Sequence, residues 1–146
     1  MSKSNTFEND LLLLLFNNTN IANIGDATGL RGSSAAGNLY IALHTADPGE
    51  AGDQTTNEVA YTSYARVAVA RSSGGFTVAT NTVTNAAAIT FPQCTGGAAT
   101  ATHFSIGTSA SGAGKILYSG ALTASLAISN GITPEFAAGD LDGTED

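Results

Sequence analysis

The sequence predicts an all-β protein: an antiparallel β-sandwich, with the jelly roll as one form of it, and one N-terminal helix on a glycine-rich linker. Three observations predict this class. Short segments that alternate apolar and polar residues follow one another after residue 38, and helical periodicity is confined to the N-terminus. The chain has 17 glycines and no tryptophan, and only 12% of its residues are charged. Such a composition is typical of a narrow core joined by tight turns.

The helix is expected over Thr6–Phe16. Asn5 and Glu8 have the spacing of a capping box, and the polar run that starts at Asn17 is expected to end the helix. Its second half is apolar nearly all round, so it is not expected to face solvent. It is expected to pack either on its own sandwich or on a neighbouring subunit. We therefore predict interface residues at Leu11, Leu12, Leu13, Leu14, Leu15 and Phe16.

Four glycines break the segment Ile21–Gly37, which is expected to be an adaptable linker. The predicted division is an N-terminal helical arm and linker, residues 1–37, followed by the sandwich, residues 38–146. Membrane insertion is not expected, because a spanning helix needs about 20 apolar residues. A signal peptide is not expected either, since Glu8 and Asp10 stand where positive charge is required.

The clearest strand is Asn38–His44, where Leu39, Ile41 and Leu43 share one face. The turn sequence Asp47-Pro48-Gly49 follows it. Two hairpins are expected, one pairing residues 64–71 with 76–78 and one pairing residues 102–108 with 115–122. The acidic tail from Ala137 is expected to be loose. The predicted buried residues are Leu39, Ile41, Leu43, Val67, Val69, Phe104 and Ile106.

No catalytic, cofactor or metal site is predicted. His44 and His103 lack the spacing of metal-ligand motifs, and the acidic loop Thr45–Asn57 does not match an EF-hand. The single cysteine, Cys94, is interpreted as a small buried hydrophobic residue. With a net charge of −7 and five scattered basic residues, the chain is not expected to bind nucleic acid.

Four stretches carry a resemblance to a known family: LYIALHTADPGEAG, NEVAYTSYARVAV, ITFP and THFSIGTSASGAGKILYSGAL. They resemble small structural proteins of tailed phages, which are often labelled tail-fibre-like and some of which are capsid cement (decoration) proteins. The resemblance covers roughly Leu11 to Glu135. Its motifs are structural rather than catalytic, so it implies a part of the virion and no enzymatic activity.

The sequence and this resemblance together lead us to expect a non-enzymatic capsid cement protein, assembled in the host cytoplasm and placed on the capsid exterior. Its expected partners are the major capsid protein and further copies of itself, as a dimer or trimer. Asp47 and Pro48 are predicted to join the helix in the interface. The alternative is a tail or tail-fibre-associated module that binds a receptor or carbohydrate, with Tyr40, Tyr61 and Tyr64 as its candidate surface.

Overall fold

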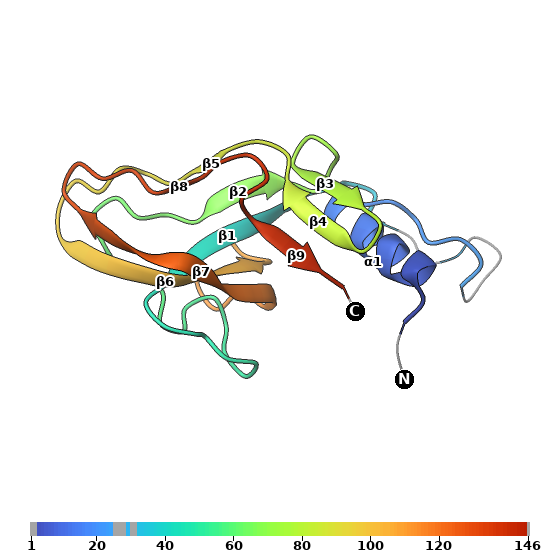
Figure 1. The fold of residues 1–146 in the computed structure, drawn as a ribbon, viewed down its shortest axis with the longest axis horizontal. Helices are drawn as coiled ribbons and strands as arrows, with labels where there is room; N and C mark the ends of the chain where they lie inside the picture. The colour runs from blue at the N-terminus through green and yellow to red at the C-terminus, as the bar shows by residue number, and fades with distance from the viewer. Residues whose placement is uncertain (1–2, 25–28, 30–31, 146) are drawn as a thin grey trace. The chain divides into compact units, whose positions relative to one another are not determined.

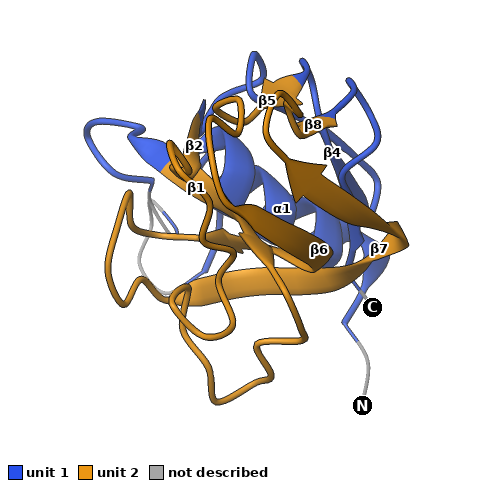
Figure 2. Cartoon of the chain, turned by 90° about the vertical axis from the view of Figure 1, so that its left-hand side faces the viewer, with its two compact units in different colours: residues 1–38, 69–88, 136–146 blue, residues 39–68, 89–135 orange. Residues whose placement is uncertain are grey.

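The computed structural model describes residues 3–24, 29 and 32–145. The chain forms two compact units (Figure 2): unit 1 comprises residues 1–38, 69–88 and 136–146, and unit 2 comprises residues 39–68 and 89–135. One helix and antiparallel strands make up the regular structure, which confirms the predicted all-β class with an N-terminal helix (Figure 1). The elements are α1 (Asn5–Asn17), β1 (Asn38–His44), β2 (Val67–Ala70), β3 (Phe76–Ala79), β4 (Thr82–Asn85), β5 (Ile89–Thr90), β6 (Ala98–Gly107), β7 (Ile116–Ser129), β8 (Glu135–Phe136) and β9 (Asp142–Thr144).

The division into an arm over residues 1–37 and a sandwich over residues 38–146 stays a prediction. Unit 1 is made of three separated stretches of chain. The first stretch ends at residue 38, close to the predicted boundary, and residues 69–88 and 136–146 also belong to unit 1. Part of the predicted linker Ile21–Gly37, namely residues 25–28 and 30–31, lies outside the described residues.

Helix α1 begins at Asn5, the residue predicted to cap it, so its N-cap lies one residue earlier than predicted. Ser4 is the N-cap, and its hydroxyl oxygen accepts a hydrogen bond from the backbone N–H of Phe7 at 3.4 Å. The predicted capping by Asn5 is therefore wrong, because Asn5 already has helical geometry and the shorter serine side chain satisfies the helix end. At the other end Asn18 adopts a left-handed conformation with φ of 56°.

Within unit 1, α1 packs against β3 and β4. Leu12 and Phe16 are both 0% exposed, and the Phe16 ring meets the Phe76 ring edge-on with centroids 4.9 Å apart. Strands β3, β4 and β9 form an antiparallel sheet in that order. The tail is therefore not loose as predicted: Leu141 is 1% exposed, and burying it fixes the strand that follows.

Unit 2 contains a four-stranded sheet of order β2-β1-β6-β7. Strand β1 has the predicted bounds, and its register with β6 pairs Ile41 with Ile106. Strands β6 and β7 form the predicted second hairpin, and β7 continues beyond the predicted residue 122 to Ser129. Strand β6 already begins at Ala98, four residues before the predicted start at residue 102.

The first predicted hairpin is wrong. Strand β2 lies at the edge of the four-stranded sheet beside β1, whereas β3 pairs with β4. Val67 and Val69 are only half-buried, since an edge strand has a neighbour on one side alone. Phe104 is also half-buried, because it stands opposite Gly120, which has no side chain to cover the ring. The other four residues predicted to be buried are buried: Leu39, Ile41, Leu43 and Ile106.

Strands β5 and β8 form a short two-stranded ribbon. Strand β8 begins at Glu135. Pro134, just before it, has no N–H to donate to a ladder. Its carbonyl oxygen still accepts a hydrogen bond from the N–H of Phe91 at 2.9 Å.

Candidate functional site

The loop after β1 projects from unit 2 as an acidic surface with a fixed conformation. Its first turn is closed by Asp47, whose carboxylate accepts a hydrogen bond from the N–H of Gly49 at 2.9 Å. The Asn57 side chain donates to the Asp47 carbonyl oxygen at 3.1 Å, and the Thr45 N–H donates to the Asn57 carbonyl oxygen at 2.7 Å. These bonds join the two ends of the loop, so its tip is presented in one geometry.

Beneath this loop lies a buried polar cluster, the loop clasp, made of Gln54, Glu58, Tyr64 and Arg66. Arg66 makes two parallel bonds to the Glu58 carboxylate, at 2.7 and 2.8 Å, and its side chain is only 2% exposed. The Tyr64 hydroxyl donates to the same carboxylate at 3.0 Å. Hydrogen bonding to Glu58 raises the pKa of Arg66, and burial raises the pKa of Tyr64. A bidentate pair of this kind fixes orientation as well as charge.

The loop clasp also holds the β6–β7 connection. The Arg66 guanidinium donates to the carbonyl oxygens of Ser109 and Gly112, at 3.0 and 2.9 Å. Gln54, which is 0% exposed, accepts from the Ser109 N–H at 3.1 Å and donates to the Tyr40 carbonyl oxygen at 3.0 Å. A Cβ placed on Gly114 would lie 2.3 Å from the Gln54 side-chain oxygen, so only glycine fits there. The loop clasp therefore holds two surface loops, the loop after β1 and the β6–β7 connection.

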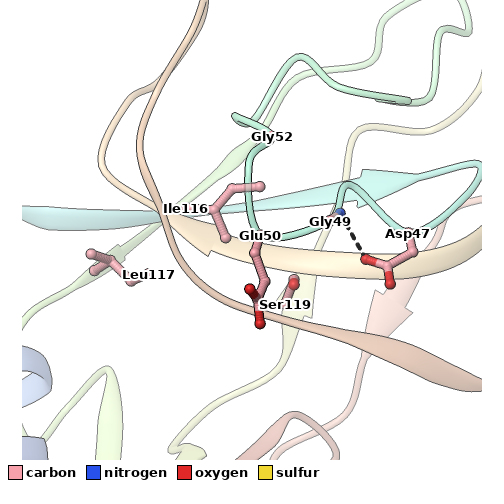
Figure 3. A pocket seen from close by; sticks show the side chains of 7 residues that line it. All are labelled: Asp47, Gly49, Glu50, Gly52, Ile116, Leu117 and Ser119. Atoms are coloured by element: carbon pink, nitrogen blue, oxygen red, sulfur yellow. Dashed lines mark hydrogen bonds between the residues drawn. The ribbon is translucent and has the colours of Figure 1, made fainter.

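Where the Asp47 loop meets the start of β7, unit 2 has an open pocket of about 350 Å³ (Figure 3). The Glu50 side chain lies beside Ser119, and Ile116 lies close to Glu50. Two carboxylates, two aliphatic side chains, one hydroxyl and exposed glycine backbone therefore share one rim. The lining residues are Asp47, Gly49, Glu50, Gly52, Ile116, Leu117 and Ser119.

The chemistry of this rim suits binding. None of the pocket's lining residues in the described chain is a histidine, cysteine, lysine or arginine. Its carboxylates can accept hydrogen bonds from a cationic or amide group, and its aliphatic side chains can pack against an apolar one. The rim can therefore contact a partner through both hydrogen bonds and apolar packing.

One buried pair in unit 2 has the geometry of a nucleophile and its base. The Nδ1 atom of His44 lies 2.8 Å from the Thr56 carbonyl oxygen, which can only accept, so Nδ1 carries the proton. Nε2 therefore accepts from the Ser105 hydroxyl, also at 2.8 Å. Both residues are 0% exposed. A substrate has no access to a sealed pair, and the bond satisfies two buried polar groups.

The structure places the predicted interface residues in different surroundings. Leu12 and Phe16 are buried inside the chain, while Leu11, Leu13, Leu14 and Leu15 are half-buried on α1. Asp47 is exposed at the pocket and Pro48 is buried next to it. Their role as an interface stays a prediction.

Sequence reasoning did not predict the loop clasp or the β7 side of the pocket. Arg66 stands in an apolar alternation, and nothing local marks it as the partner of Glu58. The tyrosines proposed as a sugar-binding platform lie differently from that hypothesis: Tyr61 is 7% exposed, and Tyr64 stacks on Phe91 with centroids 6.3 Å apart. Two of the three tyrosines are therefore packing residues.

No group of three or more His, Cys, Asp or Glu side chains within residues 3–24, 29 and 32–145 is arranged to hold a metal ion. Over the same residues, no helix has the length and apolar character that crossing a membrane requires. Cys94 is a free cysteine and is buried, as expected for a small core residue.

One protein family matches the chain over almost its entire length. Its model, described as podophage GP4 fiber I protein gp80, matches residues 2–144. None of the curated proteins matches. The family match confirms the resemblance to small phage structural proteins with tail-fibre-like names, and it identifies a virion structural protein. The chain belongs to the podophage GP4 fiber I protein gp80 family.

Proposed function

We propose that the protein is a non-enzymatic component of a virion fibre or tail appendage, attached by protein–protein contacts and assembled as a homo-oligomer. The observation that carries this proposal is the family match over residues 2–144, since the matched family is named for a podophage fibre protein. The name favours the tail-fibre alternative over the capsid exterior.

The architecture of unit 2 supports an attachment role. Its acidic loop and the β6–β7 connection are both anchored on the Arg66–Glu58 pair, at 2.7 Å. Rigid loops lose little conformational entropy when a partner binds, so more of the contact energy appears as affinity. The pocket of about 350 Å³ between the acidic loop and β7 is the surface that we assign to a neighbouring virion protein.

A non-enzymatic role fits the chemistry of the described residues. The histidine–serine pair, His44 and Ser105, is sealed in the core. The open pocket, in contrast, offers carboxylates and aliphatic groups without a nucleophile–base pair among its lining residues. Catalysis needs both components at one accessible place.

Receptor or carbohydrate binding through the tyrosines is less favoured. Sugar platforms present an aromatic face to solvent, whereas Tyr61 and Tyr64 lie edge to face, 5.3 Å apart, and are packed. The Tyr61 hydroxyl is also engaged, donating to the Pro92 carbonyl oxygen at 2.8 Å. We therefore assign these residues to the core of unit 2.

Capsid cement is the second candidate, with the major capsid protein as partner. The net charge of −7 favours it, because an acidic protein is repelled by packaged DNA and is better placed outside the shell. The same charge is compatible with a fibre, so it does not raise this candidate above the first.

Copy number and position in purified particles decide between the two candidates. Antibody labelling by electron microscopy should find the protein at fibres or the tail, and quantitative mass spectrometry should find a small number of copies relative to the major capsid protein. Labelling spread over the shell, with copies in the hundreds, would replace the fibre proposal with cement.

The attachment surface has its own test. The double variant Asp47→Lys, Glu50→Lys reverses the charge of the pocket rim, and virions grown with it should incorporate less of the protein. A matched control adds the same two lysines at exposed positions elsewhere, Thr133→Lys and Ala138→Lys. Equal incorporation of both variants would show that the pocket does not attach the protein.

A further inference from the structure

Strand β7 is a long strand with one open edge. It runs from Ile116 to Ser129, which is 14 residues, and it ends the four-stranded sheet of unit 2 (Figure 1). Its inner edge pairs with β6 along most of its length. In the part of the chain that the structure describes, no strand pairs with its outer edge. Such an edge is a ready template for another strand.

Proteins commonly protect such edges with charge or proline, and β7 has neither over its 14 residues, ILYSGALTASLAIS. The other edge of this sheet is different: β2 has four residues and stands between Arg66 and Arg71. In unit 1 the edge strand β9 is three residues long and begins with Asp142. Among the edge strands that the structure describes, β7 is therefore the longest, and it carries no charged residue.

The shape of β7 indicates what pairs with it. Ala101 pairs with Leu126 and His103 pairs with Ala121, so a single residue on β6 faces the four residues 122–125 on β7. This bulge bends the strand and, with a second register shift between Ile116 and Tyr118, leaves two regularly paired segments, residues 118–121 and 126–129. A straight partner strand would lose its hydrogen-bond register with β7 at the bend. A second β7, turned by a two-fold axis at the bulge, bends at the same place.

We propose that two copies of the protein associate through their β7 edges, antiparallel, with the two bulges facing each other. Residues 118–121 of one copy then pair with residues 126–129 of the other, and the two four-stranded sheets become continuous. The proposal specifies the surface of the homo-oligomer and rests on that part of the proposed function. Since β7 has no charged residue, its two-fold pairing places no like charges opposite each other.

Thr123 lies in the bulge, is exposed, and is near the proposed axis. Wild-type protein should sediment as a dimer or a multiple of it, and Thr123→Lys and Thr123→Glu should each sediment as monomers, with at least a tenfold weaker association. Mixing the two variants should restore the dimer, because opposite charges then meet across the axis. The matched control is Thr77→Lys, an exposed threonine on β3, which should behave as wild type.

Oxidative cross-linking provides a second readout that does not depend on a charge. Thr123→Cys should form a covalent dimer readily, whereas Thr77→Cys should not, and the native Cys94 is 0% exposed. A monomeric wild type, or an oligomer that neither Thr123→Lys nor Thr123→Glu weakens, would overturn the proposed β7 interface. Particle labelling tests the fibre assignment separately, so the two failures are distinguishable.

Discussion

The Nε atom of Arg71 donates a hydrogen bond to the carbonyl oxygen of Leu15 at 2.7 Å, which joins the residue after β2 to the last turn of α1. A second nitrogen of the same guanidinium donates to the Leu14 carbonyl oxygen at 2.8 Å, and a third contact reaches the Ala36 carbonyl oxygen at 3.0 Å. The last carbonyl groups of a helix lack partners within it and carry partial negative charge. Arg71 supplies both the donors and the opposite charge.

Replacing Arg71 with methionine should loosen the end of α1. Hydrogen bonds to a charged group contribute about 1.5–3 kcal/mol each, although only part is lost where water can take over. We expect a lower urea midpoint and faster amide hydrogen exchange in α1. Lys115→Met, which removes an exposed charge in unit 2, is the control. Unchanged exchange in α1 would mean that Arg71 does not hold the helix.

Two neighbouring leucines on α1 should respond differently to truncation. Leu12 is 0% exposed and Leu13 is half-buried. Leu12→Ala should cost about 2–5 kcal/mol of unfolding free energy, because it leaves a cavity in a packed core. Leu13→Ala should cost clearly less. Equal losses in chemical denaturation would contradict the packing of α1 described above.

Breaking the loop clasp should destabilise unit 2. Arg66→Met leaves the Glu58 carboxylate, 18% exposed, without its guanidinium. Removing one partner of a buried ion pair costs about 3–5 kcal/mol of unfolding free energy. Because Glu58 is partly exposed, we expect a loss at the low end, about 3 kcal/mol. Thermal unfolding measures it, again with Lys115→Met as control. The double variant Arg66→Met, Glu58→Leu should recover part of the loss, since no unpaired charge remains.

Acid should destabilise the protein through His44. Burial lowers the pKa of His44 below its ordinary 6.5, with Glu58, Arg66 and His103 as the nearby charged groups. The unfolded chain therefore binds a proton more readily than the folded one, so the contribution is fully present above pH 6.5 and is lost as pH falls toward the folded pKa. The slope reaches at most about 1.4 kcal/mol per pH unit.

Urea unfolding at a series of pH values measures this slope. His44→Gln should be less stable overall, because it disturbs the bonds to Ser105 and Thr56, but its stability should depend less on pH over the window below 6.5. Thr77→Gln, on an exposed residue of β3, should keep the wild-type slope. An equal slope in all three proteins would show that His44 is not the group responsible.

The sequence by itself determined the elements whose signal is local. The alternation of β1 predicted its bounds and the buried face of Leu39, Ile41 and Leu43, because strand side chains repeat every two residues, but it did not show that Ala42 and His44 on the other face are buried as well. An all-round apolar run predicted that α1 packs, and the loop between β6 and β7 predicted their hairpin. Periodicity and turn composition are properties of neighbouring residues, so one sequence is enough to detect them.

The tertiary structure alone decided everything that joins distant residues. β9 forms because Leu141 is buried and its N–H donates to Asn85, 56 residues earlier, at 2.9 Å. The loop clasp requires Arg66 to reach Ser109 across 43 positions, and Arg71 reaches Leu15 across 56. The pocket likewise unites the Asp47 loop with Ile116 and Ser119. Such contacts depend on how the chain closes on itself, and composition or periodicity does not encode which distant groups then meet.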